Sequence, residues 1–182
     1  MLPFQAMRVK SPTGGGGSTY LDVGEFGNHV AVTGDYNLGS NFKSVITVTV
    51  PDGGSGGVWV KTLHILMRTA VLGNTLKPVL YSGVISSSTL VATGQEYVIP
   101  ASFTGVDTEV TINWNVAAAP LFISAGTLSL GLITVTGDCR RSSGTTYWNA
   151  DTYSDGPASP FGTVSSSGSQ MIVWCPYSNT GP

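Results

Sequence analysis

Charged residues are scarce in this chain of 182 residues. Lys, Arg, Asp and Glu together make up 10% of it, and the net charge at pH 7 is −2. Ordinary soluble domains contain roughly 25% charged residues. Binding to nucleic acid requires clusters of basic side chains that displace counterions from phosphates, and the longest basic cluster here is the pair Arg140–Arg141. The composition argues against a nucleic-acid partner.

Long apolar runs and cysteines are also few. The first twenty residues contain no apolar stretch of the length that a signal peptide or a membrane span requires. We therefore expect no membrane partner and no export by the usual route. Cys139 and Cys175 are too few for a disulfide scaffold, and their spacing does not match a zinc site. We expect two buried free thiols, with a disulfide between them as the alternative.

Histidine, the usual base of a serine or cysteine nucleophile, occurs only at His29 and His64. The run Gly53–Gly57 matches the G-x-S-x-G pattern of a hydrolase nucleophile, but no helix follows it, so Ser55 is interpreted as a loop serine. His64 shares its strand parity with apolar residues, which predicts a packed side chain with one hydrogen bond. No catalytic residue is expected.

Pairs of carboxylates are the remaining candidates for a catalytic or metal-binding site. Asp107 and Glu109 stand in a turn that leads into a strand, where solvated acids are ordinary. Calcium requires about six to eight oxygen ligands, and four candidates are available: Asp138, Asn149, Asp151 and Asp155. Their spacing matches no calcium-binding loop, so neither a metal nor a cofactor is expected.

From residue 45 onward, short runs rich in β-branched residues alternate with clusters of Gly, Asn, Asp and Ser. This texture predicts about eight strands and an all-β fold for residues 45–182. Connections of this length favour an antiparallel jelly-roll sandwich rather than an immunoglobulin-like sandwich. The run 58–67 is apolar on both parities and should be a central strand covered on both faces. Pro78 should mark an edge strand or a bulge, because proline donates no hydrogen bond to a sheet.

Residues 1–44 have a different texture. Four consecutive glycines, Gly14–Gly17, resemble a hinge, and the following stretch is interrupted by Gly or Asn every few residues. We interpret 1–44 as an extended arm that becomes ordered against a neighbouring subunit. The aromatic residues expected to anchor this arm are Phe4, Tyr20, Phe26 and Tyr36.

The segment Tyr147–Gly162, YWNADTYSDGPASPFG, contains the densest turn chemistry of the chain. Asp155-Gly156-Pro157 is a strong turn signal, and Asn149 and Asp151 can cap backbone amides. This reading assigns every polar residue of the segment a structural role.

The same segment resembles a C-terminal pattern, Y-N-A-D-T-Y-S-D-G-P-x-x-P-F-G, of jelly-roll proteins in the virions of tailed phages, chiefly those of actinobacteria. Trp148 is a departure, because it is inserted between the tyrosine and the asparagine of that pattern. The resemblance covers residues 128–177 most specifically and is absent from the arm. We name Tyr147–Gly162 the signature segment.

The resemblance implies a non-enzymatic virion protein on the outer surface of the particle, assembled in the host cytoplasm as a homotrimer. Its partners would be the major capsid protein or tail proteins of the same virion. Fibres that bind receptors commonly carry a heptad or G-x-y stalk, and neither repeat is present, which favours decoration of the capsid.

The alternative is a tail protein that binds host cell-wall carbohydrate. Aromatic rings stack on sugar faces, and Asp or Asn side chains bond the sugar hydroxyls. The residues that could do so are Tyr147, Trp148, Asn149, Asp151 and Tyr153. An exposed Trp148 would support this alternative, and a Trp148 packed under the last strand would weaken it.

Overall fold

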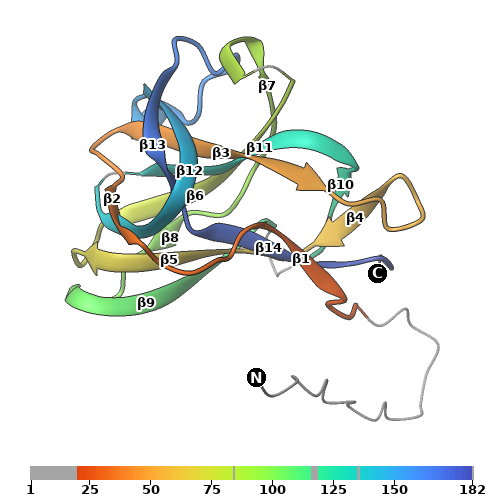
Figure 1. The fold of residues 1–182 in the computed structure, drawn as a ribbon, viewed down its shortest axis with the longest axis horizontal. Helices are drawn as coiled ribbons and strands as arrows, with labels where there is room; N and C mark the ends of the chain where they lie inside the picture. Colours follow the sequence, from red (N-terminus) through yellow and green to blue (C-terminus); the bar gives the residue numbers. More distant parts are fainter. Residues whose placement is uncertain (1–19, 84, 116–118, 135, 182) are drawn as a thin grey trace.

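The structure is a computed structural model that describes residues 20–83, 85–115, 119–134 and 136–181. These residues form an all-β fold in which every strand pairing is antiparallel (Figure 1). The strands are β1 (Gly24–Asn28), β2 (Gly34–Asn37), β3 (Phe42–Val50), β4 (Gly57–Val60), β5 (Thr62–Ala70), β6 (Thr75–Ser82), β7 (Thr89–Thr93), β8 (Tyr97–Val98), β9 (Phe103–Asn113), β10 (Leu121–Ser124), β11 (Gly126–Thr134), β12 (Asp138–Ala150), β13 (Ser165–Met171) and β14 (Val173–Ser178). Two 3₁₀ turns, η1 (Ile85–Ser87) and η3 (Tyr153–Asp155), interrupt them.

The strands form one sheet curled into a half-barrel. The hydrogen-bonded order is β10-β4-β14-β5-β12-β3-β11-β6-β7, with β1 on β14, β2 and β13 on β12, β8 on β6 and β9 on β5. Figure 1 shows β3, β6 and β11 on one side of the molecule and β5, β9 and β14 on the other. The prediction of an antiparallel all-β fold is confirmed at this level.

The main core lies between these two sides of the half-barrel. On β3 the side chains of Ile46, Val48 and Val50 are buried in it, and β5 contributes Leu63 and Ile65. Successive residues of a strand point to opposite faces, so the long apolar strands supply one such row each. Burying these rows is the dominant favourable contribution to folding.

A second, smaller core lies on the opposite face of β3, β6 and β11. It is built from Val45, Val79, Tyr81, Ile133 and Phe161, all fully buried. Consequently these three strands, and not residues 58–67, are covered on both faces. The run 58–67 is divided between β4 and β5, and burial alternates along β5.

Pro78 lies in β6 where the neighbouring strand changes. On one side Pro78 pairs with Leu132 of β11. On the other side β8 pairs with Thr75 and Leu76, whereas β7 pairs from Val79 onward. The proline therefore lies in a gap between two partner strands, where the ladder needs no N–H group. This agrees with the prediction of an irregular position, although β6 is not at the edge.

Within the predicted arm, residues 1–19 lie outside the described residues, and residues from Tyr20 onward belong to the β domain. β1 pairs along its whole length with β14, and β2 pairs with β12. The boundary expected after residue 44 falls inside β3. Because these strands are short and rich in glycine, they depend on backbone hydrogen bonds to partner strands from the far end of the sequence.

Both cysteines are free thiols in the main core, as expected. Cys139 lies on β12 and Cys175 on β14, and neither is accessible to solvent. Burial raises the pKa of Cys175 to about 12 and raises the pKa of Cys139 as well. A thiol that is buried and protonated is a poor nucleophile.

We therefore predict that the native protein does not react with a thiol reagent such as DTNB at pH 8. Two thiols per chain should react once the protein is unfolded in urea, and the rate should follow the unfolding transition. Rapid modification of Cys139 or Cys175 in the native state would contradict the structure.

Gly131 marks the closest approach between strands beneath the second core. It pairs with Val45 of β3 and with Val79 of β6. A Cβ atom built at this position would overlap the carbonyl oxygen of Ser44 and lie 2.7 Å from the Cα atom of Val45. Because these neighbours are backbone atoms, the sheet would have to shift to accommodate a larger residue.

Gly131→Ala is expected to lower the free energy of unfolding by about 1–3 kcal/mol, the usual cost of overpacking. Urea denaturation monitored by fluorescence measures it. Gly168→Ala is the matched control, since nothing lies within 4 Å of the added methyl group. Equal stability of the two variants would show that the strands around Gly131 are not packed as described.

Candidate functional site

The chain leaves β12 at Ala150, within the signature segment, and returns to the sheet at Ser165, where β13 begins. Between these points the chain forms η3 and then crosses the outer face of β3, β6 and β11. Tyr153 and Phe161 of the segment, and Val164 just after it, pack in the second core. The segment thus covers this face of the sheet.

A buried ion pair fixes the segment to the sheet. The Nζ atom of Lys43, on β3, lies 3.0 Å from the Oδ2 atom of Asp151. The Lys43 side chain is 1% exposed and the Asp151 side chain 10% exposed. Taking two charges out of water is costly, and their attraction repays that cost only when other hydrogen bonds complete the site.

Those further hydrogen bonds converge on the backbone of Ala158. Its N–H group donates to the Asp151 carboxylate at 2.8 Å. Its carbonyl oxygen accepts from the Tyr81 hydroxyl at 2.8 Å and from the Lys43 ammonium at 3.4 Å. The ion pair, the tyrosine and the loop backbone therefore form one connected network.

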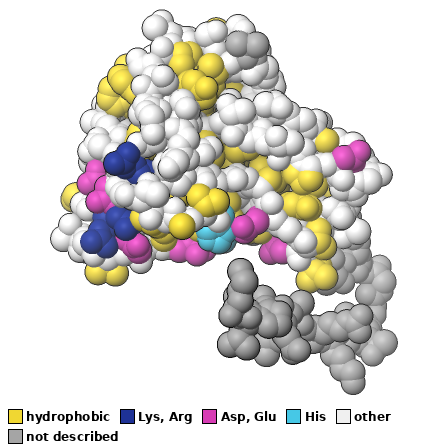
Figure 2. Space-filling view, in the orientation of Figure 1, with side chains coloured by type: hydrophobic (Ala, Val, Ile, Leu, Met, Phe, Trp, Pro, Cys, Tyr) yellow, Lys and Arg dark blue, Asp and Glu magenta, His cyan; other side chains and the backbone are white. Residues whose placement is uncertain are grey.

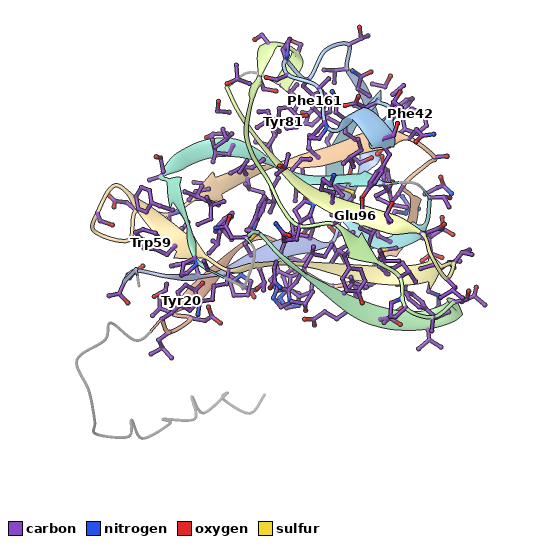
Figure 3. All side chains as sticks on the ribbon, turned by 180° about the vertical axis from the view of Figure 1, so that it is seen from behind. Tyr20, Phe42, Trp59, Tyr81, Glu96 and Phe161 are labelled. Carbon is purple, nitrogen blue, oxygen red and sulfur yellow. The ribbon has the colours of Figure 1, made fainter. Side chains whose placement is uncertain are left out.

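Aromatic rings enclose the lysine. The Nζ atom of Lys43 lies 4.9 Å from the ring centroid of Phe161 and 5.8 Å from that of Tyr81. The two rings meet edge to face at 5.2 Å, and Figure 3 shows them side by side. A cation over aromatic faces is stabilised electrostatically. Burial, followed by the charge of Asp151, raises the pKa of the Tyr81 hydroxyl.

Asn149 fastens the other end of the segment, since its side-chain amide donates to the carbonyl oxygen of Phe161 at 2.7 Å. The prediction that Asp151 caps a backbone amide is therefore confirmed, whereas the same prediction for Asn149 is wrong, because its side chain donates to a carbonyl. Sequence reasoning missed Lys43. Its signal is a lysine on the same strand parity as Val45, which is apolar and buried.

Tyr147 and Tyr153 face the same second core. Tyr147 is partly buried against it, opposite Val45 in the β12–β3 pairing. The hydroxyl of Tyr153 donates to the Glu96 carboxylate at 2.9 Å. Burial raises the pKa of Tyr153 to about 12, with the hydrogen bond and negative charge of Glu96 adding to the rise.

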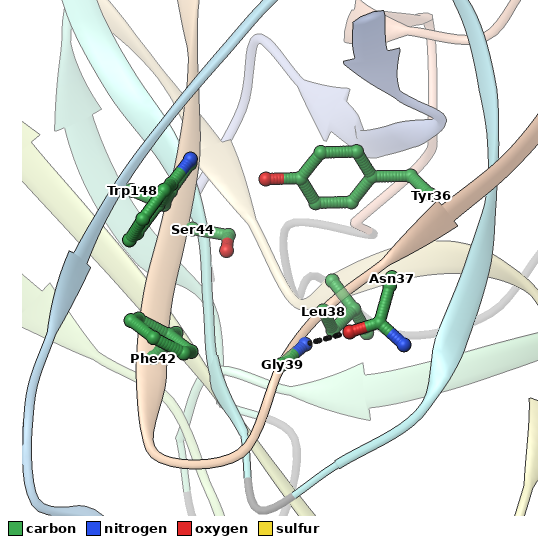
Figure 4. Close-up of a pocket in the computed structure, with 7 residues that line it drawn as sticks. All are labelled: Tyr36, Asn37, Leu38, Gly39, Phe42, Ser44 and Trp148. Atoms are coloured by element: carbon green, nitrogen blue, oxygen red, sulfur yellow. Dashed lines mark hydrogen bonds between the residues drawn. The ribbon is translucent and has the colours of Figure 1, made fainter. Parts of the chain in front are cut away.

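Trp148 points to the opposite face of β12 from Tyr147. Its ring meets Phe42 edge to face at 5.0 Å and lines a pocket of about 350 Å³ (Figure 4). The pocket is bounded by Tyr36, Asn37, Leu38, Gly39, Phe42, Ser44 and Trp148. The tryptophan is half-buried, so it is neither freely exposed nor packed under the last strand.

The five residues predicted to contact a glycan therefore do not form one surface. Tyr147, Asn149, Asp151 and Tyr153 are directed to the second core and its loop, where hydrogen bonds or packing occupy them. Trp148 alone lines the pocket on the other face. Sequence reasoning also missed Phe42 and Ser44, the β3 residues that complete that pocket.

The predicted anchoring residues also separate. Phe4 lies outside the described residues. The Tyr20 hydroxyl donates to the carbonyl oxygen of Trp59 at 3.2 Å, and Phe26 is buried in the main core. Tyr36 packs against the main core and lines the pocket beside Trp148. The described contacts of Tyr20, Phe26 and Tyr36 are thus made within this chain.

Both histidines pair with carboxylates on the surface of the β5 side. His64 Nδ1 lies 2.6 Å from Glu109 Oε1, and its Nε2 atom lies 2.9 Å from the Thr62 hydroxyl. The prediction of one hydrogen bond for His64 was too low. His29, 2.9 Å from Glu25, stacks on the ring of Trp174 at 3.9 Å.

The other candidate chemistry is dispersed. Asp107 forms ion pairs with Arg68 and Arg140. Ser55 lies exposed in the loop between β3 and β4. In the part of the chain that the structure describes, no group of three or more His, Cys, Asp or Glu residues could hold a metal ion. Over the same residues, no helix has the length and apolar character needed to cross a membrane.

No family model, no curated protein and no solved structure matches this chain.

The ion pair makes a sharp prediction about stability. Lys43→Met and Asp151→Asn should each lower the free energy of unfolding by about 3–5 kcal/mol, because each leaves one buried charge without its partner. The double variant should lose less than the sum of the two, since it leaves neither charge. Urea denaturation of the four proteins measures this coupling.

The matched control is Arg68→Met, which breaks the exposed pair between Arg68 and Asp107. Exposed ion pairs contribute at most about 1 kcal/mol, so this variant should be nearly as stable as the parent. Additive losses at Lys43 and Asp151 would contradict a coupled, buried pair.

Proposed function

We propose that this protein is a non-enzymatic structural accessory protein of a tailed-phage virion, most simply a decoration protein on the outer surface of the capsid. In this proposal the half-barrel is a jelly roll, three copies associate as a homotrimer, and the trimer binds the major capsid protein after assembly in the host cytoplasm. Jelly rolls belong to the antiparallel all-β class, and this coarser feature of the fold supports the proposal.

The observation that carries the proposal is that side chains of the signature segment hold this segment in place. Asp151 holds the segment on the sheet through Lys43 and bonds the Ala158 N–H group, and Asn149 closes the loop by bonding the Phe161 carbonyl. A motif whose polar groups are bonded internally is suited to shaping a surface. This agrees with the structural role that the resemblance implies.

The surface supports association with like copies. Figure 2 shows a face formed mostly by uncharged polar side chains and backbone, with Lys and Arg gathered at one end beside acidic residues. Several large apolar side chains are also exposed: Leu21, Val23, Val30, Val71, Leu72, Val91, Val98, Val106 and Phe122. Such a surface can be buried against protein with little desolvation of charge.

The alternative, a tail protein that binds host cell-wall carbohydrate, lacks the shared aromatic platform that was expected for it. Four of the five expected residues serve the second core. Decoration of the head therefore stays the leading proposal, with the N-terminal residues as the means of attachment.

Immunogold labelling of intact virions, with an antibody raised against folded residues 20–181, tests the proposal. We expect dense label over the head. Serum absorbed with the purified protein is the control for specificity. Label confined to the tail end would reject decoration and favour the tail protein, and the absence of label from purified virions would reject the virion assignment altogether.

Attachment is tested by deleting residues 1–19. This deletion spares β1 and β2, which the sheet requires, whereas removal of residues 1–44 would also remove part of β3. The shortened protein should fold but no longer co-sediment with undecorated capsids. Undiminished co-sedimentation would show that attachment does not depend on these residues.

A further inference from the structure

The pocket beside Trp148 has three aromatic walls from three different strands. Tyr36 comes from β2, Phe42 from β3 and Trp148 from β12. Figure 4 shows the rings arranged around a common space, with the turn at Leu38 and Gly39 closing one side. The pocket thus presents ring faces and edges rather than a flat apolar surface.

At the base of this space is a polar group without a partner. The Ser44 side chain is 1% exposed, and its Oγ atom makes no hydrogen bond with any group of the protein. A buried hydroxyl left in this state costs about 1–3 kcal/mol. Such groups are rare in folded proteins and call for an explanation.

A second hydroxyl is directed at the same space. Figure 4 shows the Tyr36 hydroxyl pointing toward Trp148 and Ser44 across the pocket. Burial raises the pKa of Tyr36, and the neighbouring hydroxyls of Ser44 and Ser167 offset part of that rise. The Ser44 hydroxyl lies close enough to lower the pKa of Tyr36 as a hydrogen-bond partner would, yet the two groups do not meet in the geometry of a formed hydrogen bond. A ligand hydroxyl beside this pair could bond both.

The lining also limits the charge and the size of an occupant. None of the seven lining side chains carries a charge, so a charged ligand would lose its hydration without gaining an ion pair. The volume of about 350 Å³ is at the small end of the range of ligand pockets, roughly 300–1,000 Å³. One six-membered ring fits this volume, and a longer ligand would have to extend through the open mouth.

From these features we propose that the pocket bounded by Tyr36, Phe42, Ser44 and Trp148 binds one neutral sugar ring, stacked on the aromatic walls, with a ring hydroxyl bonded to Ser44. A pyranose combines the two properties that the lining requires. Its C–H face packs on aromatic rings, and its hydroxyls both donate and accept hydrogen bonds.

An aromatic side chain from a partner protein is the main competitor for this space. Its ring would fill the apolar part of the pocket. A Phe side chain would leave the Ser44 hydroxyl unbonded, and a Tyr or Trp side chain offers only one polar group. The sugar satisfies both hydroxyls, and this favours it.

The inference does not rest on the virion proposal, since a pocket of this kind could serve a protein on the head or on the tail. It also differs from the glycan surface expected from the sequence, because Tyr147, Asn149, Asp151 and Tyr153 take no part. Trp148, the departure from the signature pattern, is the only member of that set in the pocket.

Saturation-transfer NMR on the full chain tests the inference, with methyl glycosides of glucose, galactose, mannose and N-acetylglucosamine as probes. Methyl glucuronide serves as the charged comparison, and p-cresol mimics an aromatic side chain. At least one neutral glycoside should receive saturation, and methyl glucuronide should not. Titration of the same probe then gives its affinity for each variant.

Ser44→Ala should leave stability unchanged or increase it, because it removes an unsatisfied hydroxyl, and should weaken glycoside binding at least fivefold. Trp148→Ala should weaken binding tenfold or more, and Trp148→Phe provides a milder change if the alanine variant fails to fold. Ser129→Ala is the matched control, since Ser129 is a buried serine on the adjacent strand β11 that does not line the pocket. Its binding should be unchanged.

Three results would overturn the inference. Binding of p-cresol without any glycoside would assign the pocket to an aromatic side chain. Glycoside binding that survives Ser44→Ala and both Trp148 variants would place the sugar elsewhere on the protein. The absence of saturation transfer to every glycoside, with the fold intact, would reject a sugar site.

Discussion

The buried pair between Lys43 and Asp151 is the interaction on which the architecture of the C-terminal half depends. One partner is on a sheet strand and the other is in the loop that covers that strand, so the pair connects two layers that the Tyr81–Ala158 hydrogen bond also joins. Neither charge tolerates burial alone. The loop must therefore be in place for the lysine to be stable, and the lysine for the loop.

Strand alternation divides the signature segment between two tasks. Tyr147 and Trp148 are adjacent in sequence, but the period of two in a strand sends them to opposite faces of β12. One residue completes the second core and the next one lines the pocket. Trp148, the residue inserted into the pattern, is the one that lines the pocket.

The parts of the fold that rest on local chemistry could be predicted from the sequence. The all-β character of the region, the free thiols and the capping role of Asp151 follow from residue types and their spacing. Other features depend on partners far away in the chain. β1 and β2 looked too broken by glycine to be stable strands, yet β14 and β12 supply their hydrogen bonds.

Likewise, the apolar run 58–67 did not show which strands would be covered on both faces. The second covering layer is the loop that contains Phe161, and this loop packs on β3, β6 and β11. The pocket was hidden for the same reason. Tyr36, Ser44 and Trp148 are separated widely in sequence and meet only through the β12 pairings. Residue types alone gave no sign that Ser44 would be buried without a bond.

The pairing of β1 with β14 has a consequence for how the protein is made. The strand nearest the start of the described chain is completed by the strand nearest its end. During translation, β1 can find its partner only after residues 173–177 have emerged, and such non-local pairing is intrinsically slow. A chain that stops before Val173 would leave Phe26 and β1 without a partner strand and the core open to water. Closure of the sheet therefore waits for β14, since only a chain that includes this strand can complete β1.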